Sequence, residues 1–105
     1  MNVRPNSKAP ASSADVQALV ALLAIGQLAI DHSRAINAVD MAKHQYHDAI
    51  RDYECGEGHI NINGPDGEEL KAATAIEYAA YLAAKRAAYN IKRRLDNACR
   101  KAVSQ

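Results

Sequence analysis

The chain has 105 residues, a hydrophobic content of 49%, no Phe or Trp, and a formal net charge of +1. Because 22 residues are Ala, nearly half of that hydrophobic content is a methyl group, which favours helix and buries little area. The composition excludes a disordered chain, an all-β fold and a disulfide-rich scaffold, and the near-zero charge excludes a DNA-mimicking inhibitor. We expect a small, soluble, all-α protein with a thin core.

The first residues, 1–13, are typical of a flexible N-terminal lead-in, and residues 14–105 then form a single domain. The most apolar window, Ala14 to Ile30, contains Asp15, Gln17 and Gln27, and it fits neither a membrane-spanning helix nor a signal peptide. We therefore expect a cytoplasmic protein that makes no contact with a membrane.

Residues 14–54 contain no proline and one glycine, which predicts one long helix. A polar stretch at residues 31–34 makes a kink there the main alternative. Apolar positions alternate at spacings of 3 and 4, interrupted by His32 and Lys43, and so predict a heptad seam. Its members are Leu22, Ile25, Ala29, His32, Ile36, Val39, Lys43, Tyr46, Ile50 and Tyr53.

A second apolar column makes the first four turns of this helix apolar on nearly every side. It consists of Val16, Leu19, Leu23 and Ile30. A helix of this kind needs neighbours on more than one side, so this column is the predicted dimer interface.

The segment Cys55 to Gly67 contains four further glycines and Pro65, which end the first helix and turn the chain. Residues 59–63 alternate as a short strand does. We favour a loop whose Ile60 and Ile62 pack over the helix ends, with an edge strand that pairs with another molecule as the alternative.

A second helix is predicted over residues 67–103, with Asp66 and Glu69 as its capping box. Its heptad seam is rich in small residues, which permit close helix approach. The seam is Leu70, Thr74, Glu77, Tyr81, Ala84, Ala88, Ile91, Leu95, Ala98 and Ala102. The two helices form a long antiparallel hairpin, which we expect to dimerise into an antiparallel four-helix bundle.

Charge is divided unevenly along the chain. Residues 1–55 carry a net charge of −1, residues 56–70 of −4 and residues 71–105 of +6. The second helix therefore presents a basic surface, the candidate site for a partner or for nucleic acid. Its residues are Lys85, Arg86, Tyr89, Asn90, Lys92, Arg93, Arg94, Arg100 and Lys101.

The sequence contains few signs of metal binding, disulfide formation or catalysis. His44 and His47, with Asp40 or Asp48, share a helix face, but they lack the ligand pattern of a known metal site and are read as a solvated face. Cys55 and Cys99 lie far apart in a hairpin and cannot form an intramolecular disulfide. No phosphate loop or nucleophile motif occurs. We expect no catalytic residue, no metal and no cofactor.

These observations favour a non-enzymatic, homodimeric interaction protein that docks on another macromolecule, mainly a protein, as a modulator or inhibitor. Compositions of this kind are common among short proteins of bacteria and their phages. The docking surfaces that we expect are the basic face of the second helix and the loop from Glu57 to Asp66. Nucleic-acid binding by the basic helix is the alternative function.

Overall fold

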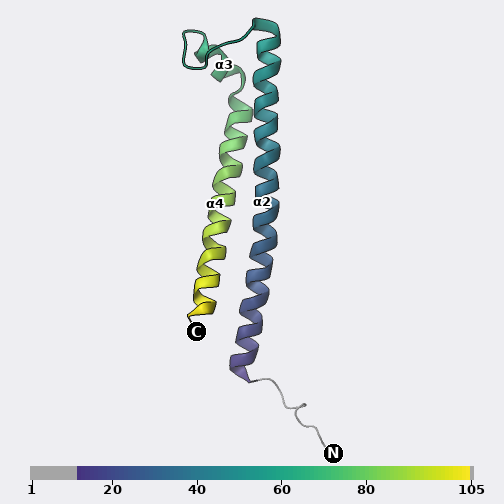
Figure 1. The fold of residues 1–105 in the computed structure, drawn as a ribbon, viewed down its shortest axis with the longest axis vertical. Coiled ribbons are helices and arrows are strands. Elements are labelled where there is room, and N and C mark those ends of the chain that lie inside the picture. Colours follow the sequence, from purple (N-terminus) through teal and green to yellow (C-terminus); the bar gives the residue numbers. More distant parts are fainter. Residues whose placement is uncertain (1–11, 105) are drawn as a thin grey trace, which may run out of the picture.

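A computed structural model describes residues 12–104, which form three helices and no strand. Helix α2 (Ser13–Glu57) runs antiparallel to α4 (Ala75–Val103), and the short α3 (Gly67–Ala73) lies at the turn of this long hairpin (Figure 1). The predicted all-α hairpin is confirmed. Most of the predicted lead-in, residues 1–11, lies outside the described residues.

Helix α2 is continuous for 45 residues, about 68 Å at 1.5 Å per residue. Ser12 is its N-cap, and the Ser12 side chain accepts a hydrogen bond from the Asp15 N–H at 3.1 Å. The kink considered at residues 31–34 is absent, because no Gly or Pro interrupts the hydrogen bonds there. The helix ends at Glu57, three residues later than predicted, where Gly58 adopts a positive φ of 84°.

The predicted helix over residues 67–103 is divided in two at Thr74. The Thr74 hydroxyl donates a 2.9 Å hydrogen bond to the Leu70 carbonyl, and the Thr74 backbone lies outside helical geometry at φ −111°, ψ 15°. A Thr side chain that bonds the carbonyl four residues earlier bends a helix in this way. Asp66 is the N-cap of α3 as predicted, but its side chain makes no capping hydrogen bond.

The predicted seam of the second helix is confirmed in full. All ten of its positions, from Leu70 to Ala102, are buried or partly buried, whereas the α4 residues between them are exposed apart from Leu82 and Cys99. Ala88 and the surrounding alanines allow α2 to approach closely.

The predicted seam of α2 consists of two alternating columns of residues, and only one of these columns faces α4. Ile25, His32, Val39, Tyr46 and Tyr53 are partly buried, but the second column faces away, since Leu22, Ala29, Ile36 and Lys43 are exposed and only Ile50 is partly buried. The residues one position earlier in the sequence face α4 instead of this second column. All but one of them are smaller than the predicted residue, which lets the backbones of α2 and α4 approach closely. These are Ala21, Leu28, Ala35, Ala42 and Ala49.

The resulting core is thin. Leu70 is 1% exposed, Thr74 2% and Ala88 6%, while no residue of α2 is fully buried. At the end of the hairpin opposite the loop, the first turns of α2 extend past the end of α4, and residues 12–20 are all exposed (Figure 1). The α2–α4 contact therefore leaves much apolar surface uncovered.

Candidate interaction surfaces

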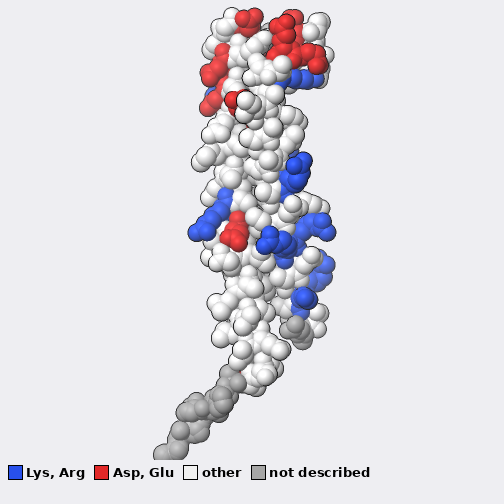
Figure 2. Space-filling view, turned by 180° about the vertical axis from the view of Figure 1, so that it is seen from behind, with Lys and Arg blue, Asp and Glu red and all other residues white. Residues whose placement is uncertain are grey.

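Seven cations form a stripe along α4, called the basic stripe below: Lys85, Arg86, Lys92, Arg93, Arg94, Arg100 and Lys101. They recur every seven residues, about 10 Å along the helix axis. All are exposed, because the seam residues between them face α2. On the face shown in Figure 2, most Lys and Arg gather around the middle of the hairpin, and most Asp and Glu gather around the loop end.

The contacts within the basic stripe are weak and local. Lys92 Nζ lies 3.4 Å from an oxygen of Asp96, and the guanidinium of Arg93 lies 5.9 Å from the centre of the Tyr89 ring. Among the described residues, no carboxylate lies within ion-pairing distance of Arg86, Arg94 or the last two cations. Their charge is therefore available to an anionic partner. Tyr89 is 63% exposed, and the predicted Asn90 is exposed beside it.

The loop end carries the opposite charge on an ordered turn. A carboxylate oxygen of Glu54 accepts a 3.1 Å hydrogen bond from the Ile60 N–H and lies 3.2 Å from Nδ1 of His59. The Asn61 side chain accepts a hydrogen bond from the Asn63 N–H, which fixes the next turn. Ile60 and Ile62 are partly buried, so residues 59–63 are the loop that we favoured, and no edge strand forms among them.

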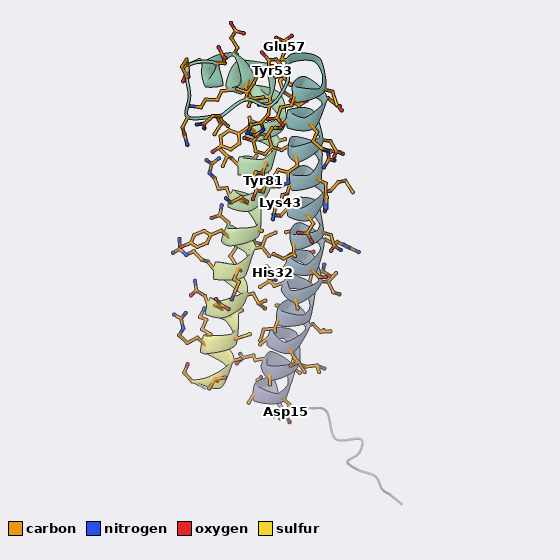
Figure 3. The ribbon with its side chains drawn as sticks, turned by 45° about the horizontal axis from the view of Figure 1, so that its top comes forward. Asp15, His32, Lys43, Tyr53, Glu57 and Tyr81 are labelled. Atoms are coloured by element: carbon orange, nitrogen blue, oxygen red, sulfur yellow. The ribbon has the colours of Figure 1, made fainter. Side chains whose placement is uncertain are left out.

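Tyr53 connects α2 to this acidic end (Figure 3). Its partial burial, together with the negative charges of Glu69 and Glu57 and a hydrogen bond to the Glu69 side chain, raises the pKa of the Tyr53 phenol above 10.0. The shift favours the neutral phenol, because an ionised Tyr53 would lie beside carboxylates of like charge.

A shallow apolar cavity of about 230 Å³ lies beside the turn, lined by Tyr46, Ile62, Lys71, Thr74 and Tyr78. The rings of Tyr46 and Tyr78 are 5.1 Å apart, an aromatic contact that supports one wall. This volume is smaller than the about 300–1,000 Å³ of cavities that usually bind small molecules. This cavity was not predicted from the sequence, although Ile62, one of the two loop isoleucines expected to pack over the helix ends, lines it.

The histidine cluster is dispersed over the surface. His44 and His47 are both exposed, Nδ1 of His44 lies 2.8 Å from the Asp40 carbonyl oxygen, and Asp48 pairs with Arg51. No group of three or more His, Cys, Asp or Glu side chains in residues 12–104 is arranged to hold a metal ion.

The apolar stripe of α2, defined by Val16, Leu19, Leu23 and Ile30, is uncovered. These side chains are 49%, 60%, 68% and 50% exposed, and Leu22 beside them is 65% exposed. By length and composition alone α2 is apolar enough to cross a membrane, a test that the core helix of a soluble protein or a signal sequence also passes. The predicted interface residues thus share one accessible face.

Comparisons with known proteins add no relative. No family model, curated protein or solved structure matches the chain.

Proposed function

We propose that the protein is a non-enzymatic helical interaction protein that docks on another macromolecule through its basic stripe. The observation that carries this proposal is the exposure of seven cations in three successive heptads of α4, all of them outside the seam that contacts α2. Side chains held at fixed intervals on a helix present a defined charge pattern, and such a pattern selects partners and speeds their association.

The partner that we favour is a protein with an acidic surface. Arginines form paired hydrogen bonds with carboxylates, and Arg86, Arg93 and Arg100 recur at seven-residue intervals along the stripe. Tyr89 lies between the first two, where an exposed aromatic ring adds apolar contact area to a charged interface. A protein that binds in this way modulates or inhibits its partner by occupying the partner's acidic surface.

Nucleic-acid binding is the second candidate, and the same surface supports it. The cations that lack a carboxylate partner suit phosphate groups, and Asn90 is exposed among them. Contacts with several phosphates make affinity fall steeply as the salt concentration rises.

A charge-reversal pair tests both functions. Arg93→Glu/Arg94→Glu changes two cations of the stripe, and Arg51→Glu/Lys71→Glu makes the same change in net charge near the loop end. Protein captured from native host cells and identified by mass spectrometry is expected with the wild type and the control pair but not with the stripe variant. Equal capture by all three proteins contradicts the proposal. Salt-sensitive binding of labelled DNA or RNA, lost in the stripe variant alone, selects the second candidate.

We further propose that the functional form is a homodimer, as expected for an antiparallel four-helix bundle. Its support is the exposed apolar half of α2, since soluble monomers rarely leave so much contiguous apolar surface uncovered. Light scattering across a concentration series tests this proposal. A monomer of 11.3 kDa at every concentration contradicts it.

A further inference from the structure

The apolar stripe of α2 has the spacing of a helix-pairing surface. Val16, Leu19, Leu23, Gly26 and Ile30 follow one another at intervals of 3, 4, 3 and 4 residues. The stripe faces away from α4, because Leu23 lies two residues from both Ala21 and Ile25 of the contact seam, about 200° around the helix.

The stripe is also short. The same spacing continues after Ile30 with polar residues, all of them exposed: Ser33, Asn37, Asp40 and His44. A partner that requires an apolar surface is therefore confined to the N-terminal half of α2.

A second helix suits this surface better than lipid does. Residues 16–30 span about 22 Å at 1.5 Å per residue, short of the ~30 Å hydrocarbon core of a bilayer. Gln17 and Gln27 interrupt the segment, and the charged residues that flank it, Asp15 and Asp31, are acidic. A helix that lies on an anionic membrane instead carries Lys and Arg beside its apolar face.

We propose that two copies pair through their apolar stripes, antiparallel and overlapping only over residues 13–36, a geometry that rests on the homodimer proposed above. In an antiparallel heptad pairing of these stripes, residue i faces residue 49 − i of the second copy. Leu19 then packs on Ile30 of the other copy, and Leu23 packs over Gly26. Apart from its chain neighbours and the backbone of its own helix turn, an added Cβ at Gly26 would meet nothing within 4 Å, so the space that Leu23 needs is open.

Charge favours this orientation. A parallel pair would place the two acidic loop ends side by side, and so bring like charges together. The antiparallel, partly overlapping pair puts the loop ends at opposite tips of a longer rod. It also places both α2 helices between the two basic stripes, which are then separated by about 20 Å or more at helix spacings of 8–10 Å. This separation exceeds the screening length of ~8 Å in physiological salt, so the two stripes repel each other little.

Contact area sets the expected affinity. Six large apolar side chains on or beside the stripe, those of Val16, Leu19, Val20, Leu22, Leu23 and Ile30, are between 49% and 68% exposed. At roughly 100 Å² for each full side chain, they offer about 350 Å² per copy before alanine and backbone surface is added. These side chains therefore contribute roughly 700 Å² to a dimer, below the about 1,200–2,000 Å² of stable specific interfaces, and we expect a weak dimer with micromolar dissociation.

A distance measurement between spin labels tests the geometry. Met41 is 64% exposed and lies outside the proposed overlap, so Met41→Cys in a Cys55→Ser/Cys99→Ala background accepts a label without blocking the pairing. In the proposed pair, the two labels are separated by the rise of 33 residues, about 50 Å. In a bundle that overlaps along the whole of α2 they are about 20 Å apart, and in a parallel pair about 10 Å.

The outcomes separate this inference from the proposed homodimer. A dimer by light scattering with labels near 50 Å supports the pairing, whereas a dimer with labels at 20 Å or less overturns it and leaves the homodimer standing. A monomer at all concentrations overturns both. Leu23→Asp is expected to abolish the dimer and the label distance, and Ile76→Asp, at an 81% exposed position of α4, is expected to retain both. Association of a monomer with vesicles of phosphatidylglycerol would instead assign the stripe to lipid.

Discussion

Gly67 offers the sharpest test of how the turn is built. It is buried at the start of α3, and a Cβ added there would lie 2.6 Å from the Ile62 carbonyl carbon and 3.2 Å from the Asn61 carbonyl oxygen. Both atoms belong to the backbone, so no side-chain rotation relieves the overlap, and the loop must move. Overpacking of this kind costs about 1–3 kcal/mol, more than the ~1 kcal/mol that Ala normally gains over Gly in a helix.

Net of that gain, Gly67→Ala is therefore expected to lower the free energy of unfolding by up to about 2 kcal/mol, which for a chain of this size is on the order of 5–10 °C in Tm. Gly56→Ala is the matched control, because Gly56 lies in the last turn of α2 and an added Cβ there meets nothing within 4 Å. It is expected to leave the Tm unchanged or to raise it by a few degrees. Thermal unfolding followed by circular dichroism at equal protein concentrations measures both. A Gly67→Ala protein as stable as the Gly56→Ala protein would refute the close packing of the loop against α3.

Three further outcomes follow from burial and charge. Leu70→Ala, at the most buried side chain, is expected to lower the free energy of unfolding in urea titrations by about 2–5 kcal/mol. The control Ile76→Ala, at an exposed position, is expected to change this free energy by less than ~0.5 kcal/mol. Because burial and nearby carboxylates raise the pKa of Tyr53, the protonated phenol contributes stability that is complete below pH 10 and is lost as the pH rises through the raised value. Thermal unfolding between pH 8 and 11 should therefore show a smaller alkaline loss for Tyr53→Phe, and an equal loss would contradict this reasoning. A thiol reagent should modify the exposed Cys55 faster than the partly buried Cys99 in the folded protein and at equal rates in urea, whereas equal rates in both conditions would exclude the observed burial.

The sequence predicted the two long helices and the loop because each has a strong local signal. Ser12 and Gly58 mark the two ends of α2, and the heptad spacing, alternating between 4 and 3 residues, identified all ten seam positions of the second helix. The basic stripe was predictable for a similar reason, since charges that lie outside a seam on a helix are exposed.

What the sequence could not decide was which column of α2 faces α4. Leu22 and Ala21 are neighbours in an apolar segment, and a reading by hydrophobicity selects the leucine. In the structure Ala21 takes the contact position, because small side chains along both helices, such as Ala102 and Ala88 of α4, let the two backbones approach closely. The bend at Thr74 was missed because it depends on a single side-chain hydrogen bond to the backbone, which leaves helical periodicity intact.

This choice of alanines explains why the candidate surfaces exist. A hairpin that closes largely on small residues buries only part of its large apolar side chains, and Leu19, Leu23 and their neighbours remain exposed on the outer face of α2. The basic stripe lies on the outer face and flanks of α4, away from the apolar stripe of α2. A second copy that covers the apolar stripe therefore leaves both basic stripes free. Two identical charged surfaces on one rigid body increase the effective concentration of the second contact, so a dimer binds a partner with two acidic sites more tightly than a monomer whose individual contacts are the same.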